Sequence, residues 1–116
     1  MSGETYSHGA EISCSLGASK LFIHRDVLEP SRASSAPHRH TENEEVVYVL
    51  KGRVTLVFGN QKHLLSEGMF VYFDPKDDEH HSIVNLSEQV AETLTFSSVS
   101  PQDQKRYPQG IEKVIQ

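Results

Sequence analysis

The residue types most able to do chemistry in this chain gather between residues 38 and 45. His38 and His40 are two positions apart, and Glu45 follows after four further residues. On a β-strand, side chains two positions apart point to the same face, about 7 Å from each other, so both imidazoles could hold one ion. Glu45 opens the next apolar run in phase with Val47 and Val49. A carboxylate that faces inward with these valines needs a partner, and a cation is the natural one.

A second histidine pair, His80 and His81, follows an acidic loop at residues 75–79. His81 is in phase with Ile83 and Asn85 and can face inward, whereas His80 would then face outward. Three imidazoles and one carboxylate form a mixed nitrogen and oxygen donor set that suits a divalent transition metal such as Mn, Fe, Co, Ni, Cu or Zn. An oxygen-only calcium or magnesium site would not use three histidines.

Each of these patterns also has an ordinary interpretation when it is taken alone. The two histidines of residues 38–40 could belong to a solvated polar loop with their neighbours Arg39, Thr41 and Glu42. The paired histidines at 80 and 81 could simply border the acidic loop. The glutamates at 42, 44 and 45 could form a charged strand entrance. The case for a metal site therefore depends on the two stretches acting together.

Together, the two stretches resemble the two motifs of the cupin superfamily. The first motif, HxH followed by four residues, Glu, six residues and Gly, is matched in full by His38, His40, Glu45 and Gly52. The second motif is matched by Gly68, Pro75, His81 and Asn85. The resemblance covers about residues 20–100.

The second motif also departs from the usual cupin pattern. Asp77 stands where a glycine would follow the proline, and Arg32 replaces a glycine that often precedes the first motif. The spacings from Gly68 to Pro75 and from Pro75 to His81 are each one residue longer than usual. His80 therefore remains an alternative ligand, although strand phase and the spacing to Asn85 favour His81, and a bulge would shift that phase by one residue.

The resemblance implies an all-β fold, a small cupin β-barrel of two antiparallel sheets, also called a double-stranded β-helix or jelly roll. Residues 1–116 would form a single domain with its core at about 20–100. One divalent transition metal would lie inside near one mouth, held by His38, His40, Glu45 and His81. Similar proteins are commonly homodimers, often with exchanged N-terminal strands, for which residues 20–28 are the candidate. The apolar set Val46, Tyr48 and Leu50 would serve either the dimer or ordinary packing between sheets.

Three functions are compatible with this resemblance, because one fold hosts many chemistries. The first is a small metal-dependent dioxygenase or other oxidoreductase acting on a small polar organic acid, which the sequence analysis slightly favours. The second is a metal-dependent sugar or keto-acid isomerase or lyase, and the third is a non-catalytic module that binds a small ligand. Weak candidates for substrate contacts are Tyr48, Tyr72, His24 and Arg25.

Length and composition agree with one small domain. The chain has 116 residues, 36% hydrophobic content and a formal net charge of −5, with an isoelectric point near 5.7. It has no basic run, so we expect no nucleic-acid partner. No apolar run reaches the ~20 residues of a membrane span, and the first ten residues lack the pattern of a signal peptide. We therefore expect no membrane association and a cytoplasmic location.

Short apolar runs separated by turns predict strands at 20–28, 44–50, 53–58, 69–73, 81–86 and 91–99. A weak strand is expected at 11–16, after a polar, mobile start at 1–10. Residues 29–37 read as a loop, and a strand is favoured over a helix near 87–94. The single cysteine, Cys14, excludes an internal disulfide and is expected to be packed near a strand edge. The C-terminal apolar residues Ile111, Val114 and Ile115 could dock or remain loose.

Overall fold

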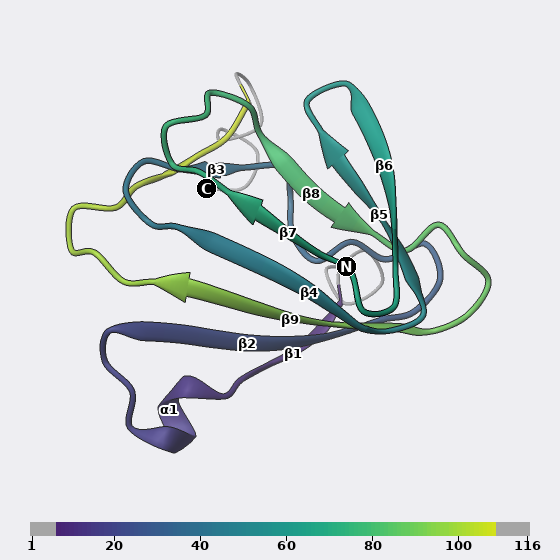
Figure 1. Cartoon of the computed structure of the whole chain (residues 1–116), viewed down its shortest axis with the longest axis horizontal. Helices are drawn as coiled ribbons and strands as arrows, with labels where there is room; N and C mark the ends of the chain where they lie inside the picture. Colours follow the sequence, from purple (N-terminus) through teal and green to yellow (C-terminus); the bar gives the residue numbers. More distant parts are fainter. Residues whose placement is uncertain (1–6, 109–116) are drawn as a thin grey trace.

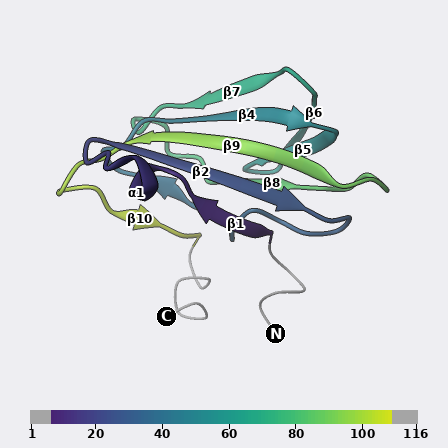
Figure 2. The same ribbon diagram turned by 90° about the horizontal axis from the view of Figure 1, so that it is seen from below.

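A computed structural model describes residues 7–108, and nearly all of its regular structure is β-strand. The largest sheet has five antiparallel strands, which lie side by side in Figure 2. In spatial order they are β1 (His8–Glu11), β2 (Leu21–Leu28), β9 (Ala91–Ser98), β4 (Glu45–Lys51) and β7 (Phe70–Phe73). The structure confirms the all-β fold expected from the sequence.

A second sheet faces the first across the interior (Figure 1). It consists of β6 (Gln61–Ser66), β5 (Arg53–Phe58) and β8 (His81–Val84) in that order. A third pairing joins β10 (Lys105–Arg106) to β3 (Arg39–His40). The arrangement fits a double-stranded β-helix.

The core forms where the inward-facing residues of the two larger sheets meet. Val47 and Val49 of β4 are buried at 4% and 0% exposure, whereas the residues that alternate with them are more exposed. The three-stranded sheet contributes Val54, Leu56 and Ile83 to the same cluster. Burial of each such side chain stabilises the fold by about 1.5–3 kcal/mol, so period-two alternation fixes which residues face inward.

The turn between β4 and β5 is the place where the fold most clearly requires a glycine. Gly52 has a φ of 78°, a left-handed conformation that side chains disfavour. A Cβ at this position would also lie 2.9 Å from the carbonyl oxygen of Val90. This turn separates the two strands that the sequence predicts at 44–50 and 53–58.

The N-terminal region differs from the expectation in three ways. Residues 8–11 form an edge strand in place of the end of a polar start, and the expected strand at 11–16 is instead the helical turn α1 (Ser13–Leu16), closed by Gly17 in a left-handed conformation. Cys14 is exposed rather than packed, and its thiol donates a 2.9 Å hydrogen bond to the Glu11 carboxylate. This local hydrogen bond favours the helical turn over a continued extended strand. No helix in residues 7–108 has the length and apolarity to cross a membrane.

The C-terminal region contains a pairing that the sequence did not indicate. Lys105 pairs with His40, and Arg106 pairs with Arg39. Two-residue strands of polar composition leave no periodic pattern to recognise. Ile111, Val114 and Ile115 lie outside the described residues.

Asn85 has a structural role in the loop that follows β8. It is fully buried, and its amide group donates to the carbonyl oxygens of Leu28 and Gln89. Its side-chain oxygen accepts hydrogen bonds from the backbone N–H and the hydroxyl of Ser87. The asparagine of the second motif thus closes the barrel next to the β8 strand and does not line the cavity described below.

Replacement of Asn85 by alanine is expected to lower the free energy of unfolding by about 3 kcal/mol, because it leaves the buried Leu28 carbonyl without its partner. Urea denaturation of the variant measures the change. Leu86→Ala is the control, since Leu86 is 59% exposed and its truncation should cost less than about 0.5 kcal/mol. Equal stability of the two variants would contradict this role.

Candidate metal centre

A short backbone bridge brings the two histidine motifs together. The backbone N–H of His38 donates to the carbonyl oxygen of His81 at 3.0 Å, and the backbone N–H of His81 donates to the carbonyl oxygen of His38 at 2.8 Å. The segment that precedes β3 therefore pairs with the start of β8. The two residues come from positions 43 apart in the chain, and their rings have centroids 4.8 Å apart.

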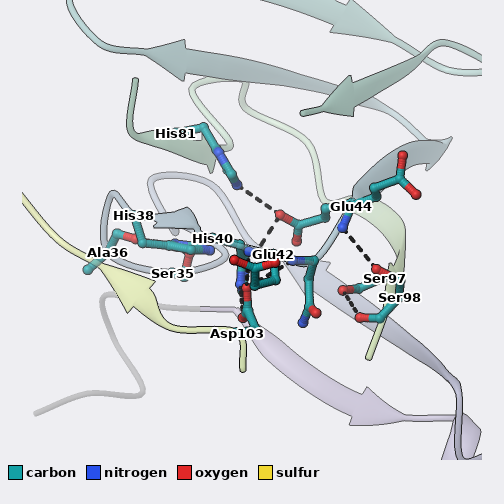
Figure 3. Close-up of polar contacts among 12 residues, drawn as sticks. Ser35, Ala36, His38, His40, Glu42, Glu44, His81, Ser97, Ser98 and Asp103 are labelled. Atoms are coloured by element: carbon teal, nitrogen blue, oxygen red, sulfur yellow. Dashed lines mark hydrogen bonds and ion pairs between the residues drawn. The ribbon is translucent and has the colours of Figure 1, made fainter. Parts of the chain in front are cut away.

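Three of the four expected ligands form a compact group. One donor atom from each of His38, His40 and Glu45 lies within 4.8 Å of the others. His38 is buried at 6% exposure, and the side chains of His40 and Glu45 are only 13% and 12% exposed. Figure 3 shows the histidines converging on this region.

The fourth residue, His81, joins the group through Glu45. Its Nε2 lies 2.9 Å from Oε1 of Glu45, and its ring stacks on Phe73 with centroids 3.6 Å apart. Both contacts hold the imidazole in one orientation. His80 points away and lines a separate surface pocket with Gly59 and Glu79, as expected for the neighbouring position on an extended strand.

Hydrogen bonds fix the orientation of the other two imidazoles. Nδ1 of His38 donates to the carbonyl oxygen of Ala36 at 2.8 Å. Nδ1 of His40 donates to the carboxylate of Asp103, also at 2.8 Å. In each ring this leaves Nε2 as the nitrogen with a free lone pair. Metal-binding histidines show this arrangement, in which the second nitrogen is held by a carboxylate or carbonyl.

The electrostatics keep the donors in the state that a metal requires. Burial lowers the pKa of His38 to about 4, and repulsion from His81 adds to the effect. Burial opposes ionisation of Glu45, but the hydrogen bond from His81 and the nearby histidines outweigh it, so the pKa of Glu45 is below its ordinary value. At neutral pH the site therefore offers a neutral imidazole beside a carboxylate. The residues fit a divalent transition metal by donor type and spacing.

A cavity of about 250 Å³ opens beside this group. His38, Glu45 and His81 form one part of its wall, and further residues of β2, β4, β8, β9 and β10 and of the loop at 34–35 line the rest. The volume lies just below the range of about 300–1,000 Å³ that is typical of pockets for drug-sized ligands. The cavity therefore suits a small molecule placed against the candidate ligands.

The weak candidates for substrate contacts divide between the two faces of the large sheet. His24 lines the cavity. Tyr48 and Tyr72 alternate with inward-facing residues, lie on the outer face and do not line the cavity, and neither does Arg25. The Tyr72 hydroxyl donates to Glu44 at 2.6 Å, which together with burial raises the pKa of Tyr72 to about 12. The structure thus places Tyr48 and Tyr72 away from the candidate ligands and places His24 near them.

Sequence reasoning missed Asp103, which orients His40. One oxygen of Asp103 binds Nδ1 of His40, and the other accepts from the backbone N–H groups of Glu42 and Asn43 at 2.9 Å. Burial opposes ionisation of Asp103, but these hydrogen bonds outweigh it and lower the pKa of the carboxyl group. No motif marks an aspartate 63 residues after its partner. The antiparallel pairing of β10 with β3 brings this segment to the site.

Comparison with known families agrees with this geometry. Residues 24–97 match the family model described as the cupin domain, which covers more than half of the chain. The chain belongs to the cupin family. All four candidate ligands lie within the matched residues.

Two solved cupin structures are similar in both sequence and fold. A protein from Acidithiobacillus ferrooxidans, provisionally named a sugar phosphate isomerase, is 30% identical with a TM-score of 0.82, and the match covers 88% of this cupin and 65% of that chain. A protein from Silicibacter pomeroyi, named a sugar phosphate isomerase from a cupin superfamily, is 27% identical with a TM-score of 0.83. The match covers 87% of this cupin and 64% of that chain.

A third match is a sequence relative. An uncharacterised protein from Methanocaldococcus jannaschii is 30% identical over 61 residues, which are 53% of this cupin and 47% of the relative. This cupin thus spans about half of that relative and less than two thirds of each of the two solved structures.

Replacement of Asp103 by asparagine is expected to weaken metal binding by 10- to 100-fold, because His40 loses the anionic partner that orients it and increases its basicity. Competition with a chromogenic chelator measures the affinity. Asp78→Asn is the matched control, since it removes the same charge from an exposed loop. Equal metal affinities for the two variants would contradict a role for Asp103 in orienting His40.

The low pKa of His38 predicts how the metal-free protein responds to acid. His38 titrates at about 4 when folded against an ordinary value of 6.5, so its contribution to stability is present above pH 6.5 and is lost as the pH falls towards 4. Urea denaturation of chelator-treated protein between pH 7.5 and 4.5 should show this loss, and it should be smaller in His38→Asn. The exposed His63 provides the control variant His63→Asn, which should keep the wild-type pH dependence. An unchanged pH dependence in His38→Asn would contradict the assignment.

Proposed function

We propose that this cupin binds one divalent transition metal ion through His38, His40, Glu45 and His81. The observation that carries the proposal is the convergence of donor atoms from His38, His40 and Glu45, with Nδ1 of each of these two histidines already hydrogen-bonded. Such an ion would act as a Lewis acid and orient a substrate through oxygen atoms. Four protein ligands would leave two positions of a six-coordinate ion for that purpose.

The wall of the cavity suggests a small, polar and anionic substrate. Lys105 lines the cavity near His38, where its positive charge contributes to the low pKa of that residue. An anionic group of the substrate could pair with this ammonium while adjacent oxygens reach the metal. The cavity volume of about 250 Å³ favours a small substrate.

Among the reaction types compatible with this site, we propose an isomerisation of a small phosphorylated or carboxylated sugar. Two similar structures, at 30% and 27% identity, are named as sugar phosphate isomerases. The ammonium group of Lys105 in the cavity wall agrees with the negative charge of that substrate class. The dioxygenase favoured by the sequence analysis would use the same metal ligands, so turnover with and without O₂ separates the two proposals.

Purified protein is expected to contain close to one divalent transition metal per chain, or to take it up when it is supplied. Elemental analysis of His81→Ala should show a strongly reduced metal content, because this variant lacks one of the four proposed ligands. In the structure that ligand is buried beside Glu45. His80→Ala is the matched control and should keep its metal. Full metal content in the double variant His38→Ala/His40→Ala would overturn the metal proposal, and loss of metal in His80→Ala alone would reassign the ligand.

The reaction type is tested with metal-loaded protein and a panel of three- to six-carbon sugar phosphates. Conversion to an isomer under argon at the same rate as in air supports isomerisation. A requirement for O₂, with consumption of O₂ matching substrate loss, supports the dioxygenase. Saturable binding without turnover would support the third function, a ligand-binding module.

We also propose that the protein is a homodimer that uses the outer face of the five-stranded sheet. The exposed apolar side chains of this face include Leu21, Phe70 and Tyr72, at 43%, 69% and 49% exposure. Val46 and Tyr48 lie on the same face between them. Exposed apolar patches of this kind are typical of protein–protein interfaces.

Light scattering at micromolar concentration should give about twice the chain mass of 13.0 kDa. Phe70→Lys should shift the protein towards the monomer, because it places a charge in the proposed interface. Leu64→Lys is the control, since Leu64 is 60% exposed but lies on β6 in the other sheet. A monomeric wild-type protein would overturn the dimer without affecting the metal proposal.

A further inference from the structure

His81 differs from the other two candidate histidines in what holds its ring. Nδ1 of His38 donates to a backbone carbonyl, and Nδ1 of His40 donates to a carboxylate. The His81 side chain is hydrogen-bonded through Nε2 only, and its Nδ1 has no partner among residues 7–108. The flat face of its ring lies against the ring of Phe73 instead. One candidate ligand thus lacks the hydrogen-bonded support that metal-binding histidines usually have, and an aromatic contact takes its place.

The stack of Phe73 on His81 is close and almost parallel. The ring centroids are 3.6 Å apart and the ring planes differ by 8°, so the two rings are in van der Waals contact over most of their area. Both residues are buried, at 6% and 5% exposure. Two neutral aromatic rings prefer an offset or edge-to-face arrangement with centroids about 4.5–7 Å apart. The face-to-face geometry observed here therefore calls for a further explanation.

The backbone holds Phe73 in this place from two directions. On β7, Phe73 is the register partner of Glu45 on β4, so the two side chains share the inner face of the large sheet. Residues 74–80 connect β7 to β8, and Phe73 and His81 flank this connection at its two ends. Phe73 also belongs to the buried apolar cluster. Close packing in that cluster leaves the phenyl ring little freedom to turn away from His81.

The charge distribution of a phenyl ring makes this contact sensitive to the state of the imidazole. The face of the phenyl ring carries partial negative charge and attracts positive charge placed over it. An imidazole whose Nε2 lone pair is donated to a divalent cation loses electron density, so its ring becomes more positive than that of free imidazole. Contact with the face of Phe73 is therefore more favourable for a metal-bound His81 than for a metal-free one.

We infer that Phe73 is a positioning residue of the metal centre, and that the face of its ring stabilises His81 more strongly in the metal-bound state than in the metal-free state. The inference rests on the proposed function, because it requires His81 to be a ligand. Phe73 acts through His81, and the fixed ring keeps Nε2 rather than Nδ1 directed towards Glu45. The phenyl ring thus gives His81 the support that hydrogen bonds give the other two histidines.

The test changes the charge on the face of the ring and keeps its shape. Fluorine atoms withdraw electron density from the ring face, so 4-fluorophenylalanine and 3,4,5-trifluorophenylalanine are incorporated at position 73. Competition with a chromogenic chelator measures the affinity for Co²⁺, and urea denaturation measures the stability of the metal-free protein. The affinity should fall stepwise with the number of fluorine atoms, by about three-fold or more for the trifluorinated ring. The stability of the metal-free protein should stay close to that of the wild type.

Phe73→Leu removes the flat face and keeps an apolar side chain. Its affinity for Co²⁺ should fall at least as far as that of the trifluorinated protein. The visible absorption of bound Co²⁺ should also change, because the orientation of His81 is no longer fixed. An unchanged absorption spectrum together with wild-type affinity would overturn the inference.

Phe58 provides the matched control. It is the register partner of His81 on β5 and lines the same small pocket as Phe73, but its ring does not stack on His81. The same fluorinated residues at position 58 should leave the affinity for Co²⁺ unchanged. An affinity that does not fall with fluorination at position 73, or that falls equally at position 58, would also overturn the inference. Failure of the wild-type protein to bind Co²⁺ would instead overturn the proposed function, so the two failures are distinguishable.

Discussion

The antiparallel bridge between His38 and His81 is the constraint on which the site depends. Its two backbone hydrogen bonds, at 3.0 and 2.8 Å, attach the segment before β3 to the start of β8. The bridge fixes His38 beside His81, and the pairing of β3 with β10 holds His40 next to them. Because the bridge is made by backbone atoms, it leaves both imidazole side chains free to face the interior. Fixed backbone positions of this kind preorganise a metal site before the metal arrives.

Around that bridge, each donor is restrained by a different kind of contact. A backbone carbonyl holds His38, a carboxylate holds His40, and a stacked phenyl ring holds His81. The buried carboxylate of Glu45 then lies among imidazoles, where the hydrogen bond from His81 partly compensates for its burial. A buried charge is stable only with such partners, so the same contacts that orient the ligands also make the ionised Glu45 tolerable in the interior.

Most of the fold and the four candidate ligands could be predicted from the sequence because they depend on local periodicity. Glu45 is in phase with the inward-facing Val47 and Val49, and His81 is in phase with the buried Ile83. The structure places the Glu45 carboxylate beside the His81 ring. The groups that depend on contacts between distant segments left no such pattern. Asp103 reaches His40 from 63 residues away, and the helical turn at residues 13–16 is favoured by local hydrogen bonds that an alternation argument does not consider.

The match to the family model includes the candidate ligands but not every group around them. The four candidate ligands lie within residues 24–97, which match the family model. Several groups that shape their surroundings lie outside that range: Asp103 behind His40, Lys105 in the cavity wall, and Ser7 and Gly9 beside Asp26. A barrel can therefore keep one metal-binding arrangement while short terminal strands, which bear little of the core, change the polar groups that a ligand meets. If the cavity binds a ligand, the groups that the ligand meets come from both parts of the chain: Lys105 lies outside the matched range, whereas His24 and Thr95 lie within it.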